Sequence, residues 1–398
     1  MARLTIDDLQ VNGKKILLRV DFNVPLDEKQ NVTDDFRIRA ALPTISKLLN
    51  DGARVILMSH LGRPKGKKDP KYSLKPVADK LGELINNKVY FAPDCIGEEV
   101  KKMVGLLKEG EVLLLENLRF HAAETKNDPE FSAQLAELAD IYVNDAFGTS
   151  HRAHASMAGV AEYFKQRAAG YLLEKELHYL RDYLDKPEKP YTAILGGAKV
   201  TGKIEIIEKL FGKVDNILIG GGLAYTFLKA KGYQIGKSLL EEDKIELARE
   251  TLENAKQHGC NIYLPTDVVA VTEIVEDAEM TVVGADQIPE DKMGVDIGPE
   301  TTMIFTNIID ESKTVLWNGP MGIFEIQQFS TGTESIARKL AYITTRGAVT
   351  VVGGGDSASA LKKFKLMDKV THVSTGGGAS LELLSGLELL PVNLISTK

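Results

Sequence analysis

The chain has 398 residues, enough for two or three domains, and two of about 200 residues each is the most natural division. Its 49 basic and 56 acidic side chains give a net charge of -7, which excludes a broadly polycationic nucleic-acid-binding protein. With 43% hydrophobic and 26% charged residues, disorder and fibrous repeats are also excluded. We therefore expect a soluble globular protein, by default a monomer with no nucleic-acid partner.

The cysteines and the apolar runs indicate the compartment. Only Cys95 and Cys260 are present, without CxxC spacing, so neither a disulfide framework nor a cysteine zinc site is expected. The sequence MARLTIDDLQ has acidic residues where a signal peptide would be apolar, and no apolar run reaches about 18 residues. These features predict a cytoplasmic protein with no membrane partner.

Short β-branched runs recur along the first half of the chain, at residues 16–20, 55–58, 89–91, 112–115 and 141–143. They are continuous rather than alternating, as in strands buried on both faces, and stretches between them such as 130–139 have helical spacing. The second half repeats this plan at residues 192–195, 217–219, 262–264, 314–317, 349–352 and 370–373. We therefore predict an α/β fold of two doubly wound, parallel-sheet (Rossmann-like) domains.

A helix is expected between the two domains. Leu173, Leu177, Leu180 and Leu184 follow the i, i+4, i+7, i+11 spacing of an amphipathic helix, which ends in the breaker stretch 185–190. This predicts an N-terminal domain at 1–170, a linker helix at 171–187, a C-terminal domain at 188–378 and a C-terminal segment at 379–398. The sequence leaves open on which domain the last segment packs, the N-terminal domain being one option.

Basic residues follow the predicted strands of the first half. In open parallel sheets, ligands bind beyond the carboxyl ends of the strands. The residues there include Asp21, Asn23, His60, Arg63, Arg119, His151, Arg152 and His154, and Arg37 opens the helix after the first loop. A single arginine there would most simply cap a helix or pair with an acid, and a lone histidine is usually structural. Four arginines at corresponding positions instead favour a small ligand with phosphate and carboxylate groups.

Glycine and lysine follow the predicted strands of the second half, at residues 196–203, 220–222, 318–322, 353–357 and 375–378. Backbone without Cβ approaches phosphates closely, and the helices that follow direct free N–H groups toward them. One such run would as often be a tight turn, but five in one domain predict a nucleotide site.

Two near-matches to known motifs narrow this prediction. Residues 197–203 fit a P-loop, but Ile204 stands where Ser or Thr would hold magnesium. Residues 353–358 fit the dinucleotide pattern GxGxxA, but the Asp356 carboxylate would repel a pyrophosphate unless a divalent cation lay between them. The pattern therefore favours a magnesium-nucleotide over NAD, with a helix N-cap as the simpler role for Asp356.

The motifs DFNVP, SHLGRP, ENLRF, HRAH, GGAKVTGK, WNGPMGIFE, GGGDS and STGGGASLE occur in this order along essentially the whole chain. In this the sequence resembles the phosphoglycerate kinase family. The resemblance implies a glycolytic enzyme that reversibly transfers a phosphoryl group between ATP and the carboxylate of 3-phosphoglycerate, giving ADP and 1,3-bisphosphoglycerate. It also implies Mg²⁺ as cofactor, bound as Mg-ATP or Mg-ADP.

The resemblance also implies roles for individual residues. It assigns phosphoglycerate binding to Asp21, Phe22, Asn23, Arg37, His60, Leu61, Gly62, Arg63, Arg119 and Arg152. It assigns nucleotide binding to Lys203, Asn318, Glu325, Gly353, Gly354, Gly355, Asp356 and Ser357, with Asp356 also at the metal. It assigns the catalytic group to Arg37, Lys199, Lys203, Gly354 and Gly377, and leaves open which lysine follows the transferring phosphoryl group.

The expected chemistry needs no general base, because a carboxylate acceptor has no proton to lose. The protein must instead align the reactants, exclude water and neutralise charge. Since the two sets of ligands are predicted on separate domains, we expect hinge closure around residues 187 and 380 to bring Arg37 toward Lys203.

Two other functions fit parts of the sequence. An NAD-dependent dehydrogenase would use residues 353–358 but would want an acidic residue about 20 positions on, where the chain runs into Ser374 and a glycine run. A non-catalytic receptor for a phosphorylated metabolite would not explain a second phosphate-binding face.

Overall fold

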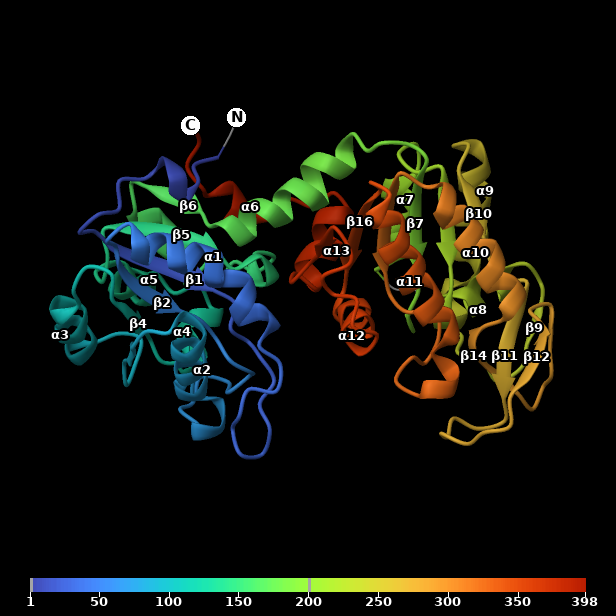
Figure 1. Ribbon diagram of the computed structural model, residues 1–398, viewed down its shortest axis with the longest axis horizontal. Helices are drawn as coiled ribbons and strands as arrows, with labels where there is room; N and C mark the ends of the chain where they lie inside the picture. The colour runs from blue at the N-terminus through green and yellow to red at the C-terminus, as the bar shows by residue number, and fades with distance from the viewer. Residues whose placement is uncertain (1–2, 200–201) are drawn as a thin grey trace. The chain divides into compact units, whose positions relative to one another are not determined.

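The computed structural model describes residues 3–199 and 202–398, which fold into two units (Figure 1). The first unit runs to His178 and also includes Glu388–Lys398, and the second comprises Tyr179–Leu387. Residues 171–185 are helical, first as α6 (Tyr171–Leu177) and then as the π-helix η6 (His178–Tyr183). The four leucines that predicted a helix here are all buried. No helix in the described part of the chain is both long and apolar enough to cross a membrane.

The first unit is built on a six-stranded parallel sheet in the order β3-β4-β2-β1-β5-β6. Its strands are β1 (Lys15–Val20), β2 (Arg54–Met58), β3 (Val89–Phe91), β4 (Val112–Leu114), β5 (Ile141–Asp145) and β6 (Arg167–Ala169). The first five confirm the apolar runs, and their parallel pairing confirms the predicted fold class. The sixth strand was not predicted, because its three residues include two alanines and no β-branched side chain.

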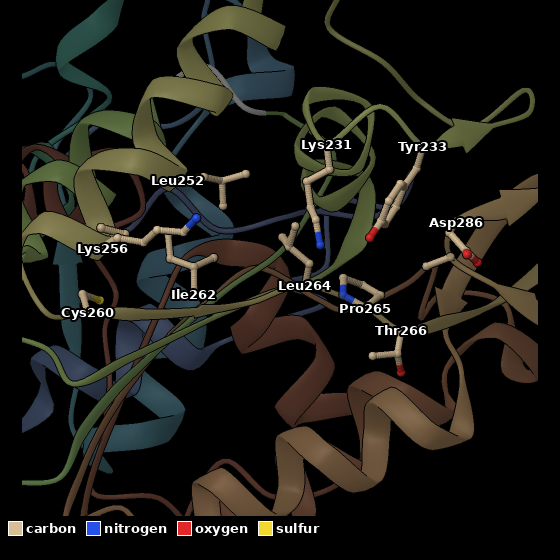
Figure 2. A pocket seen from close by; sticks show the side chains of 12 residues that line it. Lys231, Tyr233, Leu252, Lys256, Cys260, Ile262, Leu264, Pro265, Thr266 and Asp286 are labelled. Atoms are coloured by element: carbon tan, nitrogen blue, oxygen red, sulfur yellow. The ribbon is translucent and has the colours of Figure 1, made fainter.

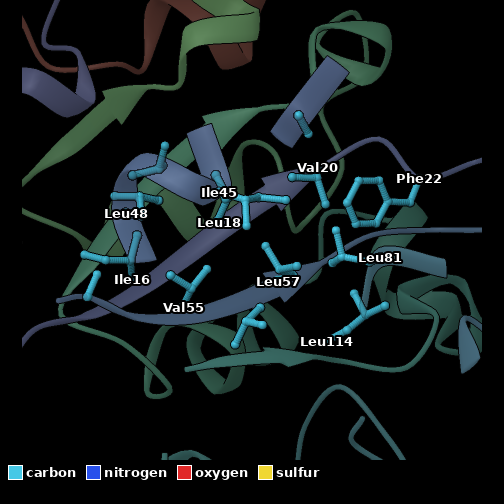
Figure 3. Close-up of a cluster of buried hydrophobic side chains, with 14 of the residues drawn as sticks. Ile16, Leu18, Val20, Phe22, Ile45, Leu48, Val55, Leu57, Leu81 and Leu114 are labelled. Carbon is cyan, nitrogen blue, oxygen red and sulfur yellow. The ribbon is translucent and has the colours of Figure 1, made fainter. Parts of the chain in front are cut away.

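Helices cover both faces of this sheet. They are α1 (Phe36–Asn50), α2 (Lys75–Ile85), α3 (Glu98–Leu106), α4 (Ala122–Thr125), α5 (Pro129–Ala136) and the short turns η1 (Ile6–Asp8), η2 (Pro70–Tyr72), η3 (Leu118–Phe120), η4 (Phe147–Thr149) and η5 (Gly159–Tyr163). Ile16 and Leu18 of β1 pack with Ile45 of α1 in one core (Figure 3). The alternate residue Leu17 packs in the core of the other face, with α3 and α5. Each fully buried Leu or Ile stabilises the fold by about 1.5–3 kcal/mol.

The second unit has a main sheet in the order β10-β8-β7-β15-β16-β17, also parallel throughout. Its strands are β7 (Tyr191–Leu195), β8 (Asn216–Ile219), β10 (Asn261–Tyr263), β15 (Thr314–Asn318), β16 (Val349–Gly353) and β17 (His372–Val373). Smaller sheets unite β12 (Thr281–Gly284), β11 (Asp267–Val271) and β14 (Met293–Ile297), and β13 (Gln287–Ile288) with β9 (Gln234–Ile235). These smaller sheets were not expected from the sequence.

Helices connect the strands of the second unit. They are α7 (Ile204–Leu210), α8 (Gly221–Ala230), α9 (Ile245–Gln257), α10 (Pro299–Glu311), α11 (Thr331–Thr345), α12 (Gly355–Lys363) and α13 (Gly378–Leu384), with the turns η7 (Glu242–Lys244) and η8 (Gln327–Phe329). Phe305 of α10, Ile336 of α11 and Leu361 of α12 share one core with Trp317 of β15.

The end of the chain packs on the first unit. Leu4 N donates to the Ser396 carbonyl at 2.7 Å, and Ser396 N donates to the Arg167 carbonyl at 2.9 Å. Leu394, which follows α14 (Leu390–Asn393), contacts the core beneath α3 and α5. The first and last segments of the chain therefore meet beside β6.

Candidate active site

Arg37 is held by a buried carboxylate at the end of the first strand. Its Nη1 donates to both carboxylate oxygens of Asp21 and to the Asn23 carbonyl, each at 3.2 Å. The Asp21 side chain is 6% exposed, whereas that of Arg37 is 31% exposed. The guanidinium group is thus fixed on one side and open to solvent on the other, which suits it to bind an anion with little reorganisation.

His60 follows β2 and is buried in the same region. Arg19 Nη2 donates a hydrogen bond to His60 Nδ1 at 3.1 Å. Burial, together with the charges of Arg19, Arg119, Arg152 and Arg37, holds the pKa of His60 well below 6.5. The imidazole is therefore neutral, and since Nδ1 accepts, the proton lies on Nε2.

Asn117 ties the loops after β2 and β4 together. Its Oδ1 accepts hydrogen bonds from Leu61 N at 3.2 Å and Arg119 N at 3.0 Å. Its Nδ2 donates to the carbonyls of Leu61 at 2.7 Å and Tyr72 at 2.8 Å. Arg119 Nη1 donates to the Gly62 carbonyl at 2.8 Å. The backbone around Leu61 and Gly62 is therefore fixed by side chains from a neighbouring strand end.

A cavity of about 360 Å³ lies at these loops and is strongly cationic. Its lining includes Arg63, Lys65, Arg119, Lys126, Arg152 and His154, and no described carboxylate lines it. Burial and the charges of Arg152 and Arg19 lower the pKa of Arg119 to about 10, and burial with the same cluster lowers the pKa of His154 to about 4. The buried Nε of Arg119 has no hydrogen-bond partner among the described residues. A bound anion would relieve this repulsion.

Of the predicted acceptor residues, Arg63, Arg119 and Arg152 line this cavity. The others do not line it, namely Asp21, Phe22, Asn23, Arg37, His60, Leu61 and Gly62. Phe22 and Leu61 are buried in the core under α1 and α2. Any ligand contact at these positions would come from the backbone.

In the second unit, glycine-rich loops follow β7, β8, β15 and β16. Another glycine-rich loop precedes α13. Lys203, just before α7, donates to the carbonyl of Gly196. Burial lowers the pKa of Lys203 to about 8, although the Asp356 carboxylate opposes this shift. Lys199 is exposed in the same loop, whereas Val200 and Thr201 of this predicted motif lie outside the described residues.

Asn318 and Gly354 meet where β15 and β16 end. The buried Asn318 Nδ2 has no hydrogen-bond partner in the described part of the chain. Gly354 has φ +92°, and a Cβ there would lie 3.1 Å from that same nitrogen. The glycine therefore permits both the backbone conformation and the close approach. Ser357 Oγ, one turn along α12, accepts from Gly319 N at 2.7 Å.

A cavity of about 380 Å³ opens beside these loops. Its lining combines backbone of the glycine loops with Tyr225, Leu239, Ile274 and Val295 and with the charged residues Lys237, Glu325 and Asp356. Gly354, not Asp356, is the N-cap of α12, and Asp356 lies exposed in its first turn without a capping hydrogen bond. The N-cap interpretation of Asp356 is therefore wrong. An apolar slot beside open backbone and carboxylates suits a nucleotide with a bound cation.

Comparison with known proteins identifies the family. A family model described as phosphoglycerate kinase matches residues 6–387. This chain belongs to the phosphoglycerate kinase family. Curated phosphoglycerate kinases of Chlorobium chlorochromatii and Chloroherpeton thalassium are each 56% identical to it, over 98% and 100% of both chains. The wheat (Triticum aestivum) protein named "Phosphoglycerate kinase, cytosolic" is 54% identical over 97% of this chain and 96% of its own.

Solved structures agree. Phosphoglycerate kinase from Coxiella burnetii matches with a TM-score of 0.88 at 41% identity, covering 99% of this chain and 98% of that one. The enzyme from Pyrococcus horikoshii matches with a TM-score of 0.85 at 30% identity, covering 98% of each chain. Phosphoglycerate kinases transfer a phosphoryl group between ATP and 3-phosphoglycerate in glycolysis, which confirms the predicted family, fold and activity and sets aside the dehydrogenase and receptor alternatives.

Sequence reasoning missed Lys65 and Lys126 of the cationic cavity, as well as Arg19 and Lys237. Arg19 is fully buried and contacts His60, and an arginine inside the apolar run of β1 was a signal available in the sequence. Lys237 lines the cavity of the second unit but follows the two-residue strand β9 and belongs to no glycine motif. No pattern in the sequence singles it out.

Proposed function

We propose that the cationic cavity of the first unit binds 3-phosphoglycerate and that the cavity of the second unit binds ATP or ADP. The observation that carries this division is the contrast in lining. Arginine, lysine and histidine without a carboxylate surround the first cavity, whereas glycine backbone, apolar side chains and two carboxylates surround the second. The first suits a small ligand bearing phosphate and carboxylate, and the second suits a nucleotide that brings a cation.

The proposed acceptor site comprises Asp21, Asn23, Arg37, His60, Arg63, Arg119 and Arg152, with backbone of Phe22, Leu61 and Gly62. Arg37 is already oriented by Asp21, so its open side can neutralise charge that develops on the transferring group. His60, neutral with its proton on Nε2, can donate a hydrogen bond to a ligand oxygen. No step requires either residue to accept a proton.

The proposed donor site comprises Lys199, Lys203, Asn318, Glu325, Gly353, Gly354, Gly355, Asp356, Ser357 and Gly377. The amide nitrogen of Asn318 has no hydrogen-bond partner among the described residues, so it can donate to a phosphate oxygen. Lys203 supplies positive charge beside Asp356. Lys199, which is exposed four residues after the end of β7, supplies a second amine, and the Lys203 and Lys199 variants described below separate the roles of the two lysines.

The donor set fits Mg²⁺. Magnesium is usually held by one or two carboxylates together with substrate phosphates and water, and Asp356 offers one exposed carboxylate oxygen pair at the nucleotide cavity. We propose that Asp356 holds the ion, which would neutralise phosphate charge when bound. Asp356→Ala should raise the Mg²⁺ concentration needed for half-maximal activity, and an unchanged Mg²⁺ dependence would contradict this role.

Transfer requires the acceptor carboxylate and the terminal phosphate to meet. Because we assign them to different units, we propose that the units close when both ligands are bound, around the helix at 171–185 and the segment near residue 380. Small-angle scattering should show a smaller radius of gyration with both ligands than with either alone. No change would contradict closure.

Calorimetric titration of each ligand tests the division of sites. Arg152→Ala should weaken 3-phosphoglycerate binding by about tenfold or more while Mg-ADP binds as in the wild type, and Asp356→Ala should do the reverse. Loss of both ligands in either variant would contradict two separate sites. We further propose a cytoplasmic monomer without nucleic-acid or membrane partners, which light scattering and cell fractionation can test.

A further inference from the structure

A second cavity of about 520 Å³ in the second unit is lined by none of the residues proposed for the substrate sites (Figure 2). It shares no lining residue with the nucleotide cavity. Helix α8 separates the two, because Gly221 at its start lines the nucleotide cavity and Lys231, just past its end, lines this one. Ten helical residues rise about 15 Å, so the two cavities are distinct sites.

One side of this second cavity is apolar. Leu252 of α9 faces Ile262 of β10, and Leu264 and Pro265 continue along the same side (Figure 2). Leu252, Ile262 and Leu264 are only half-buried, so the fold leaves apolar surface open inside a concavity. Cys260 adds to this wall as a neutral thiol, because burial raises its pKa to about 11. Covering such surface with the apolar part of a ligand is favourable.

Two lysines at the same cavity have no acidic partner. The side chain of Lys256 makes no hydrogen bond or ion pair with any described residue. The Lys231 ammonium group lies over the Tyr233 ring, 4.8 Å from its centre. Their amines extend over the apolar wall in Figure 2. The one acidic residue of the lining, Asp286, lies exposed beyond Tyr233, at the other end from Lys256. The positive charge of Lys256 therefore lies at the apolar end of the cavity, and the negative charge of Asp286 lies at the other end.

The helix ends near the two lysines limit the negative charge that a ligand bound there can carry. Lys256 lies in the last turn of α9, and Lys231 directly follows α8. Helix C-termini carry partial negative charge, which opposes a multiply charged anion. No glycine loop lines this cavity, in contrast to the nucleotide cavity. A single anionic group therefore fits this site better than a polyphosphate.

We propose that this cavity is a binding site for a small amphipathic monoanion, with an aromatic or aliphatic body on Leu252, Ile262 and Leu264 and its carboxylate or sulfonate at Lys231 and Lys256. The site is independent of phosphoryl transfer, since none of its residues belongs to either substrate site.

Fluorescence titration with 8-anilinonaphthalene-1-sulfonate tests the proposal on the full chain with both substrate sites saturated by Mg-ADP and 3-phosphoglycerate. We expect binding to persist under these conditions. The double variant Lys231→Ala/Lys256→Ala should weaken it by about tenfold or more, and Leu252→Glu should abolish it. Lys229→Ala is the matched control, because Lys229 is exposed on α8 and does not line the cavity.

The enzymatic activity of each variant shows whether it is correctly folded, because the substituted residues lie outside the substrate sites. We expect kcat within about twofold of the wild type. The uncharged analogue N-phenyl-1-naphthylamine should bind the wild type more weakly than the sulfonate. The proposal is overturned if saturating substrates displace the sulfonate, if the active double variant binds it unchanged, or if the uncharged analogue binds equally well.

Discussion

The Nδ1 atom of His60 accepts a hydrogen bond from Nη2 of Arg19 at 3.1 Å, in the interior of the first unit. An arginine cannot accept, so this contact is incompatible with a proton on Nδ1. We therefore predict that His60 is neutral at pH 6.5, where an ordinary histidine is half protonated. Nitrogen-detected NMR of the imidazole should show the Nε2–H tautomer. A doubly protonated ring at that pH would contradict the assignment.

We predict that Lys203 makes the reaction sensitive to alkaline pH. Its pKa in the free protein is about 8, lowered from 10.5 chiefly by burial. If Lys203 binds phosphate as proposed, its charged amine is the active form, and kcat/KM for Mg-ATP should fall as the pH rises through about 8. Lys203→Arg keeps its charge throughout this range, so its profile should stay flat there. An unchanged alkaline limb in Lys203→Arg would assign it to another group, and the same substitution at Lys199 would test that amine.

Arg37→Ala should lower turnover far more than nucleotide affinity. The guanidinium group is held by Asp21 and Asn23 in the first unit, so we expect kcat to fall by about 10²–10³-fold while the Kd for Mg-ATP stays within about twofold. Arg39→Ala is the matched control, because Arg39 is exposed and forms an ion pair with Asp35, the N-cap of the same helix. A variant in which only nucleotide affinity changed would show that Arg37 does not act in the acceptor site.

Asn117→Ala should destabilise the first unit. The buried amide makes hydrogen bonds to Leu61, Tyr72 and Arg119, and its removal leaves their backbone groups without partners. We expect a loss of about 2–4 kcal/mol in the free energy of unfolding, measured by urea denaturation, and a higher KM for 3-phosphoglycerate. Asn307→Ala, at an exposed position of α10, should leave both unchanged. Equal stability of the two variants would mean that Asn117 does not fix the loops.

The central strands could be predicted because burial on both faces leaves continuous apolar runs, as in residues 16–20 and 314–317. The smaller sheets could not. The outer strand β12 is only half-buried, in alternation, and the strands β9 and β13 have two residues each, too few for any pattern. Their pairing depends on contacts far apart in the sequence.

The residues of the candidate sites could be predicted where a polar side chain lies at the end of a strand. Asp21 follows β1, and Asn318 ends β15. The sequence does not show that Phe22 turns into the core, nor that Asn117 joins two loops, because both depend on which strands are neighbours. The helical spacing of the leucines predicted a helix at residues 171–187, and the chain is helical over 171–185. The spacing did not predict the π-helix within this range, since side-chain periodicity indicates the buried face and not the hydrogen-bond pattern.

The most direct test is to measure ADP formation from Mg-ATP with and without 3-phosphoglycerate, while a coupled reduction removes the acyl-phosphate product. We predict turnover that depends on the acceptor and is lost in both Arg37→Ala and Lys203→Ala, each in a different unit. Equal ADP formation without 3-phosphoglycerate, or full turnover in either variant, would contradict the assignment of the two sites.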